Sequence, residues 1–556
     1  MHDFYCVHCG DQLTHRSGRS ATNKEPNRYR FKCGNCGKSS YFSVHVEGSN
    51  VPPTNEYDDY HEEDVIIQPD DDQQEEQSNI DDEDSPISFF RDSDYIKSIT
   101  SKKKIVITSA QNNAEVDDAF LSTLERYCYC NDAALIIIPI KYKMGGADAP
   151  AFSYDERLLP YLVDNNIMLP DHRINIRCNL KLLATAVNPI YSMDAFSKGN
   201  TLILGHSQLQ LKTLARGKDR KYPPILTTTG SVTKESYSMS RSGAQADFNH
   251  CMSAVVLELT DTEFFLRHLN YDTDNKCFYD MNMRWYNGGS TYCHASALVT
   301  GDTHVGSHDS EVYKATFGPN GLVDVLRPQY LISHDVLDFH SRSHHSIKDQ
   351  FVEYIKNQTE TDDVNSELDT TCKYIIDNTP VGTTNIIVCS NHDTHLNRWL
   401  KEADIRKDPV NAKIYHYLSY LMYEKMSNDP EHIPQAFEVY FDDYLKKNPS
   451  NCGKVVFLDE FDTFKLHGIE LAIHSHIGQN GSRGSVRQFA NVPDKMVVGH
   501  SHSPNINKGC YQVGTSTKFH LPYQKGLSSW DHCHCIIHQN GKRQMVFLRN
   551  GKFWAE

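Results

Sequence analysis

Long hydrophobic runs are missing from this sequence. No run approaches the ~20 apolar residues that a membrane-spanning helix needs. The first residues also lack the basic and apolar regions of a secretory signal peptide. The 16 cysteines are scattered and do not have the spacing of a disulfide framework. Because disulfides are rare where thiols are kept reduced, we expect a protein of a reducing cytoplasm.

Basic residues are absent between Glu56 and Asp84, where fifteen aspartates and glutamates occur. Such a segment cannot bury enough apolar surface to become ordered, so it predicts a disordered linker. Without this segment a chain of net charge −16 is nearly neutral, so the overall charge does not exclude nucleic acid as a partner. The linker is either a solvated tether, which is the simpler interpretation, or an anionic competitor of a polyanionic substrate.

Two pairs of cysteines precede the acidic segment. Cys6 and Cys9 form one C-x-x-C pair, Cys33 and Cys36 form another, and 23 residues separate the pairs. Four thiolates at this spacing predict a zinc ribbon that holds one structural Zn²⁺ and takes no part in catalysis. The module is rich in arginine and lysine, which fits contact with nucleic acid or with a protein partner.

Five short motifs rich in histidine, aspartate and asparagine occupy the C-terminal half. Each follows a short apolar run, and such runs predict buried strands. Because open α/β sheets bind ligands at strand ends, the motifs predict one site built from several strand ends. They are Gly301-Asp302-Thr303-His304, Asp335, Asn391-His392-Asp393, His474 and Gly499-His500-Ser501-His502.

The residue types in these motifs indicate a metal centre. Imidazole and carboxylate together suit manganese, iron or zinc, and the motifs offer enough ligands for two ions. A two-metal site holds its ions ~3.5–4 Å apart, activates a water molecule and stabilises an in-line displacement at phosphorus. One carboxylate must bridge the pair, and Asp335, alone at its strand end, is the candidate. His392, which lies beside Asp393, is a further ligand or a proton donor.

The order of the motifs resembles that of the calcineurin-like metallophosphoesterases, over roughly residues 290–545. The resemblance implies a catalytic His392-Asp393 pair, in which His392 protonates or stabilises the leaving oxygen. It also implies a bridging role for Asp335 and two ligand sets, which are Asp302, His304 and His502 for one metal and Asn391, His474 and His500 for the other.

The chain departs from that family pattern beside its ligands. The family has glycine before the bridging aspartate and before the asparagine, where this chain has His334 and Ser390. These departures concern the geometry of the loops more than metal binding. At the fourth motif His476 is a second candidate, although the family pattern selects His474.

The middle of the chain repeats part of this pattern. It predicts an internal duplication, in which residues ~104–285 form a degenerate phosphoesterase-like domain. Ala110 stands where Asp302 is expected and Gln208 where His502 is expected, so this copy would have lost its metals. The alternative is coincidence between two unrelated α/β domains. The matched segments are 107–112 with 299–304, 203–208 with 497–502, 230–234 with 514–518, and His250 with His532.

Basic residues and histidines outside the motifs are candidates for substrate contacts. Runs of charge are usually solvated faces, but long basic side chains also hold the phosphates of a duplex without reading its sequence. One group lies in a loop of the middle region and the other follows Asp335. The candidates are Arg216, Lys218, Arg220, Lys221, His340, Arg342, His344 and His345.

These features predict an α/β protein in four parts. They are a zinc ribbon at 1–48, an acidic disordered linker at 49–96, an α/β accessory domain at 97–288, which under the duplication hypothesis is the degenerate repeat, and a catalytic domain at 289–556. The resemblance implies that the catalytic domain is a metallophosphoesterase β-sandwich flanked by helices.

The whole chain also resembles the DNA-degrading early proteins of tailed bacteriophages. That resemblance implies a deoxyribonuclease that uses two metal ions, Mn²⁺ above all, with little sequence specificity. It would act on host DNA in the cytoplasm of the infected bacterium, as a homo-oligomer. Two alternatives are a phosphoesterase acting on nucleotides or phosphoproteins and a non-catalytic DNA-binding scaffold.

Overall fold

The computed structural model describes residues 89–142, 152–521, 524 and 526–555, together with three strands near the N-terminus. The chain divides into two compact units, residues 1–81 and 82–556. In the first unit, β1 (Arg16–Arg19), β2 (Arg28–Lys32) and β3 (Ser39–Ser43) form one antiparallel sheet. The predicted zinc ligands Cys6, Cys9, Cys33 and Cys36, and most of the predicted linker, lie outside the described residues.

The second unit contains two sheets with a matching strand order, which we call the larger and the smaller face sheet. The larger has the order β19-β18-β17-β16-β25-β26, in which β16 to β19 are parallel, β25 is antiparallel to β16, and β26 is antiparallel to β25. The smaller has the order β12-β11-β4-β5. Their strands are β4 (Lys104–Gln111), β5 (Ala134–Ile140), β11 (Ser253–Leu259), β12 (Phe264–Asn270), β16 (Ala297–Val299), β17 (Tyr330–Ser333), β18 (Thr384–Ile387), β19 (Lys454–Phe457), β25 (Cys533–Ile537) and β26 (Arg543–Phe547).

A third sheet of ten strands joins the two halves of the unit. Its order is β20-β21-β22-β24-β23-β9-β10-β8-β7-β6, and the antiparallel pair β9–β23 connects one half to the other. The strands are β6 (Ile167–Leu169), β7 (Ile174–Arg177), β8 (Thr201–Leu204), β9 (Gln210–Thr213), β10 (Ile225–Thr228), β20 (Lys465–Leu466), β21 (Ile469–Glu470), β22 (Lys495–Val498), β23 (Asn505–Asn507) and β24 (Cys510–Gln512).

The strands of the two halves correspond one to one across the β9–β23 pair. On either side the order is mirrored, and each pair of neighbours has the same parallel or antiparallel sense. The smaller face sheet likewise matches β26-β25-β16-β17 of the larger, which adds β18 and β19. A shared strand order is what an internal duplication requires, and we infer a duplication from it.

Side-chain hydrogen bonds repeat in the same register. The hydroxyls of Ser231 and Thr233 lie 2.8 Å apart, as do those of Thr515 and Thr517. His250 Nε2 lies 2.8 Å from the carbonyl oxygen of Thr233, and His532 Nε2 lies 2.8 Å from that of Thr517. Two unrelated domains with the same strand order would not be expected to share these side-chain hydrogen bonds. The matched bonds therefore favour duplication over two unrelated domains.

A common core underlies both halves. One buried apolar cluster contains Ile107 and Val255 from the first half and Val299 and Cys535 from the second. A further antiparallel sheet, made of β13 (Cys277–Asp280), β14 (Met283–Tyr286) and β15 (Gly289–Tyr292), extends the first half. The boundary predicted at 288/289 falls in the turn between β14 and β15, so the halves meet inside a hairpin.

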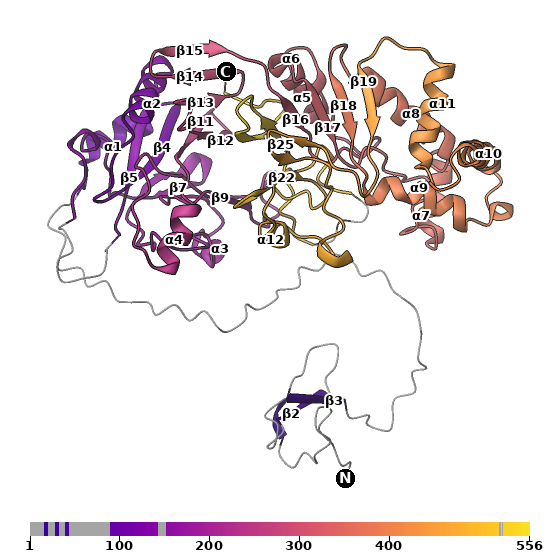
Figure 1. Cartoon of the computed structure of the whole chain (residues 1–556), viewed down its shortest axis with the longest axis horizontal. Coiled ribbons are helices and arrows are strands. Elements are labelled where there is room, and N and C mark those ends of the chain that lie inside the picture. The colour runs from indigo at the N-terminus through magenta and orange to yellow at the C-terminus, as the bar shows by residue number, and fades with distance from the viewer. Residues whose placement is uncertain are drawn as a thin grey trace. The chain divides into compact units, whose positions relative to one another are not determined.

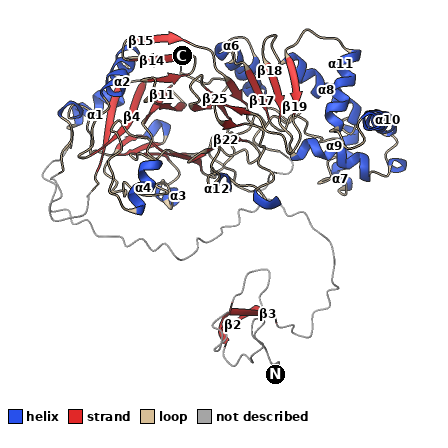
Figure 2. Ribbon diagram, viewed as in Figure 1, coloured by secondary structure: helices blue, strands red, loops and turns tan. Residues whose placement is uncertain are grey.

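Most of the helices lie at the periphery of the second unit, with the strands between them (Figure 2). Helices α7 to α11 gather at one end, beside β18 and β19 (Figure 1). There Phe437 of α11 packs edge-on against Phe457 of β19, with ring centroids 5.3 Å apart. The helices are α1 (Ser93–Thr100), α2 (Asp118–Cys130), α3 (Met193–Phe196), α4 (Arg241–Phe248), α5 (Ser310–Phe317), α6 (Leu322–Leu326), α7 (Gln350–Gln358), α8 (Val364–Asp377), α9 (Asn391–Glu402), α10 (Ala412–Asn428), α11 (Ala436–Lys447) and α12 (Val486–Phe489).

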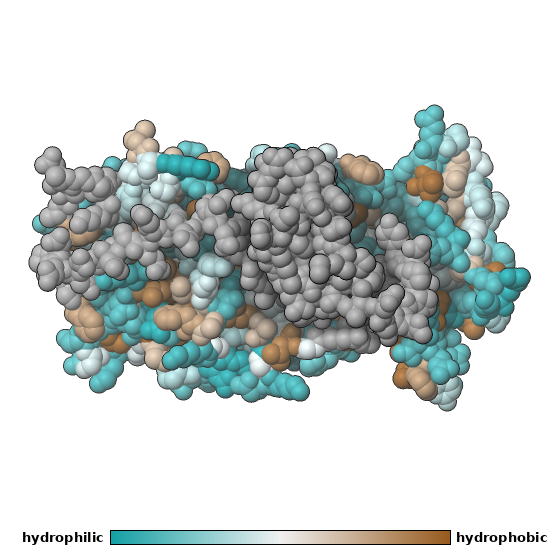
Figure 3. Space-filling model, turned by 90° about the horizontal axis from the view of Figure 1, so that it is seen from below, coloured by the Kyte–Doolittle hydropathy of each residue, from teal (hydrophilic) through white to brown (hydrophobic). Residues whose placement is uncertain are grey.

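Hydrophilic residues cover most of the coloured surface in Figure 3, and hydrophobic ones lie there in small separate groups. Isolated apolar residues are normal on a protein surface. Among the described residues, no helix combines the length and hydrophobicity that a membrane crossing requires.

Candidate metal centre

The five predicted motifs come together at the carboxyl ends of the parallel strands of the larger face sheet. Strands β16, β17 and β18 are parallel, so their carboxyl ends lie together and carry the first three motifs. The fifth motif follows β22. The fourth differs from the prediction, because the apolar run at 471–473 is not a strand and β21 ends at Glu470. The Glu470 carboxylate accepts hydrogen bonds from the backbone N–H groups of Phe464, Leu471 and Ala472, and these bonds replace strand pairing there.

Asp335 lies at the centre of the site. Three groups of side chains with ligand atoms within 4.8 Å of one another share it. His474 Nε2 lies 3.0 Å from Asp335 Oδ2, and His304 Nε2 lies 3.5 Å from the same oxygen. Asp335 is therefore placed as a bridging carboxylate must be. The groups are His304, Asp335 and His392; Asp335, His474 and His500; and Asp302, Asp335 and His502.

The buried oxygens of the site fit metal ions. Asp302 and Asp335 are only 0% and 1% exposed. Among the described residues, Oδ1 of Asp302, of Asp335 and of Asn391 has no hydrogen-bond partner. Because a buried carboxylate is costly unless it is paired or coordinates a metal, these atoms suit divalent cations. The donor set could hold two ions, one on each side of Asp335.

Backbone strain is concentrated at the same residues. His304, Asp335, His500 and His502 have φ angles of 44°, 45°, 79° and 58°. Non-glycine residues adopt this left-handed region at a cost, and such residues cluster at functional sites. Gly499 also has to be glycine, because a Cβ atom there would lie 2.4 Å from Asp302 Oδ1. These backbone conformations lower the stability of the fold, but they bring the side chains of the site together.

Asp338 is a member of the site that the sequence analysis missed. Its Oδ1 lies 3.1 Å from His304 Nδ1 and 3.4 Å from His392 Nδ1, and its carbonyl oxygen lies 2.8 Å from His392 Nδ1. A carboxylate behind a ligand histidine fixes the tautomer and orientation of the ring. The only signal in the sequence was an acidic residue three positions after Asp335.

Asp338 orients the His392 ring. Because a carbonyl oxygen only accepts, Nδ1 carries the proton in the bond to the Asp338 carbonyl oxygen. Burial opposes a charge on this ring, but the Asp335 carboxylate and the hydrogen bond with Asp338 outweigh it and raise the pKa of His392 to about 10. The histidine neighbours conversely hold the pKa of Asp335 well below its ordinary value, although burial opposes this.

In the first half, the side chains at the corresponding positions form hydrogen bonds with backbone groups. Asn112, which stands for His304, bonds through its amide to the backbone of Tyr142. His206 Nε2 lies 3.1 Å from the Leu183 carbonyl oxygen, and Gln208 donates to the Val187 carbonyl oxygen. Within the described part of the first half, no group of histidine, cysteine and acidic side chains could hold a metal. This half supports the other without a centre of its own.

Comparison with known proteins places the chain in a family. No family model matches the sequence. Protein A1 of Escherichia phage T5 is 31% identical over 472 residues, which cover 82% of this chain and 83% of that protein. The chain belongs to the A1 family. The alignment covers most of this chain and most of the phage protein, so the sequence similarity extends far beyond the metal centre.

Two solved structures are similar to a smaller part of this A1-family chain. They are a double mutant of Vps29 from Entamoeba histolytica and Vps29 from Chaetomium thermophilum, with 19% and 9% sequence identity. They cover 31% and 32% of the chain, and 93% and 94% of their own chains, with TM-scores of 0.18 and 0.19. Scores this low support no conclusion about the A1-family protein.

Asp393 supports the start of a helix in this A1-family protein. Ser390 is the N-cap of α9: its Oγ accepts from the Asp393 backbone N–H and donates to Asp393 Oδ2 at 2.9 Å. Burial and the Asp335 charge raise the pKa of Asp393 to about 7. The predicted catalytic residue thus orients the helix that carries Asn391 and His392, and is in none of the ligand groups.

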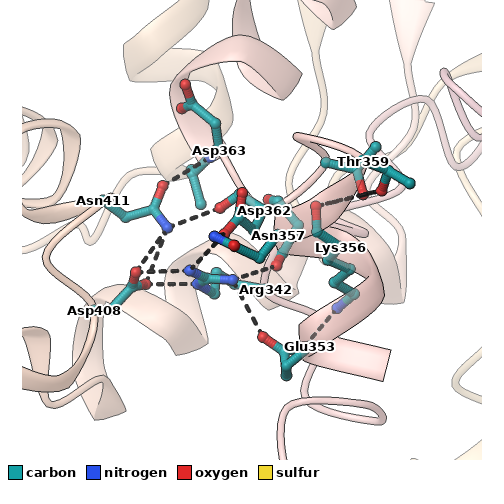
Figure 4. Close-up of polar contacts among 12 residues, drawn as sticks. Arg342, Glu353, Lys356, Asn357, Thr359, Asp362, Asp363, Asp408 and Asn411 are labelled. Carbon is teal, nitrogen blue, oxygen red and sulfur yellow. Dashed lines mark hydrogen bonds and ion pairs between the residues drawn. The ribbon is translucent and has the colours of Figure 1, made fainter. Parts of the chain in front are cut away.

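Arg342 has an internal role instead of the predicted contact with substrate phosphate. Its side chain is 9% exposed, and its guanidinium binds Asp408 at 2.6 Å and Glu353 at 3.2 Å. Figure 4 shows this network, in which Asn411 also donates to Asp408. These ion pairs tie the loop after Asp335 to α7 and to the segment before α10, and they leave no free guanidinium face for a phosphate.

Arg216 also makes internal contacts, and these join the two halves. Its backbone N–H donates to the Ser528 carbonyl oxygen at 2.9 Å and its guanidinium to that of Trp530 at 3.0 Å. The guanidinium also lies 4.3 Å from the ring centroid of Phe519. The Trp530 ring in turn lies 4.3 Å from that of the ligand-type His502, so a series of contacts leads from Arg216 to the centre.

The remaining predicted substrate contacts are at the surface or the rim. Lys218 and Lys221 are exposed, while Arg220 is partly buried. Lys221 Nζ lies 3.4 Å from Glu311 and donates to Asn550, so it bridges the halves. His340 is partly buried. His344 and His345 lie beside His395, which in turn neighbours His392, so the structure brings these two predicted contacts close to the metal site.

Replacement of Arg216 by alanine is expected to weaken metal binding at the centre without removing a ligand. Loss of outer-shell support commonly lowers metal affinity ~10–100-fold. Titration of the purified protein with Mn²⁺ would measure this shift, with Lys218→Ala as a control because Lys218 is exposed in the same loop. An unchanged Mn²⁺ affinity in the folded Arg216→Ala variant would show that the contact with Trp530 does not position His502.

Proposed function

We propose that this A1-family protein is a metal-dependent phosphodiesterase that degrades DNA with little sequence specificity. The observation that carries the proposal is the convergence of ligand-type side chains on Asp335, from three groups that share its carboxylate. A shared carboxylate between two ligand sets is the arrangement that phosphoryl-transfer chemistry with two metals uses. DNA and further copies of the chain are its proposed partners, and the cytoplasm of an infected bacterium is its proposed location.

Two divalent ions bound around Asp335, Mn²⁺ in the first place, would activate a water molecule and neutralise charge on the phosphate. Asp302, His304 and His502 would hold one ion, and Asn391, His474 and His500 the other. Asp338 keeps the His304 and His392 rings in place. His392 Nε2 delivers a proton to the leaving oxygen or stabilises its charge.

A long polyanion fits the rest of the chain better than a small ester. The first half has no candidate metal group among its described residues but contributes a complete sheet arrangement and a contact to Trp530, whose ring lies beside that of His502. Together with the predicted basic zinc ribbon, this exceeds what a small-molecule hydrolase requires. Exposed lysines such as Lys218 suit contacts with phosphates away from the cleaved bond.

Digestion of a closed circular duplex tests the proposal. The wild-type protein with Mn²⁺ is expected to convert the circle to smaller products, and Asp302→Ala to leave it intact, because Asp302 supplies a buried carboxylate to the centre. A linear duplex of the same sequence is the control. An untouched circle with a degraded linear duplex would indicate an exonuclease that needs ends.

The dependence of the rate on salt concentration, measured in the same assay, distinguishes a nucleotide phosphoesterase from a nuclease. Binding of a polyanion weakens steeply with salt because counterions are released, whereas a small nucleotide responds weakly. Hydrolysis of a small phosphodiester that is insensitive to salt, with neither DNA degraded, would contradict the proposed substrate.

A further inference from the structure

Three histidines form a second cluster beside the metal centre. His344, His345 and His395 offer ligand atoms that all lie within 4.8 Å of one another. The ring centroids of His344 and His345 are 3.8 Å apart, and those of His344 and His395 are 4.3 Å apart. No acidic side chain belongs to this group. The cluster therefore differs in chemistry from the groups that share Asp335.

Helix α9 places the cluster next to the centre. Residues three positions apart lie on the same face of a helix, so His395 stands one turn beyond His392. Their ring centroids are 5.0 Å apart. Asn391 and His392 thus serve the centre from the first turn of α9, and His395 serves the cluster from the next.

The loop that carries His344 and His345 is held in place on its N-terminal side. The Glu367 carboxylate accepts from the backbone N–H groups of His340 and Ser341 at 2.7 and 2.9 Å. Next along the chain, Arg342 is fixed by Asp408 and Glu353. Ligands held by their surroundings lose little freedom on binding, which favours a preorganised site. This accounts for the buried ion pairs in a loop that is otherwise exposed at His345.

The chemistry of the cluster suits a cation. A neutral imidazole ring offers a nitrogen lone pair to a metal ion. Among the described residues, Nδ1 of His395 is buried and has no hydrogen-bond partner.

We propose that His344, His345 and His395 form a third metal site, which binds one ion of the Zn²⁺ class. Three imidazoles with an open fourth position are a common zinc set, and a site without carboxylates disfavours Mg²⁺ and Mn²⁺. Because His345 is exposed, the fourth position faces solvent and can accept a water molecule or a phosphate oxygen of the substrate. The site would then bind a phosphate next to the one that is cleaved.

The number of bound ions tests this site without any assay of activity. The full-length protein is dialysed against buffered Zn²⁺, and its metal content is measured by mass spectrometry. His345→Ala is expected to hold about one ion fewer per chain than the wild type. His416→Ala is the matched control, because His416 is also exposed and lies in no ligand group. The predicted zinc ribbon contributes equally to all three proteins and cancels.

A second pair of variants separates this site from the centre. Asp335→Asn is expected to lose the ions of the centre and to keep the third, and Asp335→Asn with His345→Ala to lose both. Substitution of Co²⁺ adds a spectroscopic readout, since the absorption of cobalt bound by three histidines should vanish only with the cluster. Equal metal content and equal Co²⁺ spectra for wild type, His345→Ala and His395→Gln, all folded by circular dichroism, would overturn the third site and leave the centre at Asp335 untouched.

Discussion

Replacement of Asp335 by asparagine is expected to remove both ions of the centre and to lower the rate of DNA cleavage by at least ~10³-fold. Removing one electrostatic stabiliser of a transition state already costs ~10²–10³-fold, and Asp335 is shared by every ligand group around the centre. Asparagine keeps one oxygen but loses the charge, and its NH₂ group cannot bind a second ion.

The substitution is mild for the backbone, which makes the result interpretable. Asp335 has a φ angle of 45°, and asparagine tolerates the left-handed region well. Asp377→Asn is a suitable control, since Asp377 lies on α8 in an exposed ion pair with Lys373. Metal content and cleavage rate are measured for both variants. Retention of both ions by folded Asp335→Asn would rule out the bridging role.

Replacement of His392 by alanine should lower the rate of cleavage while the ions of the centre stay bound. General acid catalysis by one side chain contributes ~10²–10⁴-fold, and His392 is oriented for it through Asp338. His392 lies in a ligand group with His304 and Asp335, so metal content decides between a ligand and a proton donor. Loss of metal in folded His392→Ala would assign it to the ligands.

The pH dependence of the rate gives an independent check on His392. A proton donor is active below its pKa and inactive above it, so the wild-type rate should fall as the pH rises through that value. Because Asp335 and Asp338 raise the pKa of His392 above 6.5, the fall is expected on the alkaline side of neutrality. The His392→Ala variant should lack this alkaline limb. His416→Ala, which changes an exposed histidine away from the ligand groups, should keep it.

The predicted ligands were accessible to sequence analysis because each lies within a few residues of a strand. Asp302, His304, Asp335 and His502 follow short apolar runs that form β16, β17 and β22. The carboxyl ends of parallel strands lie on the same side of a sheet, so the pattern of an apolar run followed by polar residues suffices to predict a shared site. The repeat was also readable, since paired segments such as 230–234 and 514–518 keep their residue types in order.

Other functional residues could not be read from the sequence because their partners are remote. Arg216 was predicted to contact phosphate from its place in a basic run, yet it binds Trp530 more than three hundred positions away. Arg342 is likewise paired with Asp408. A basic side chain in a loop looks the same whether it meets a phosphate or a buried carboxylate, since only packing decides what lies opposite.

By itself the sequence determined the residue types of the candidate metal centre, their order along the chain and the paired segments from which we infer a repeat. These properties follow from local apolar patterns and from side-chain chemistry. Only the tertiary structure decided that β9 and β23 join the halves in one sheet, that Asp338 holds His304 and His392, and that His395 meets His344 and His345. Such contacts depend on how helices and loops pack across the sheets, because residues far apart in the chain become neighbours only when the whole core has formed.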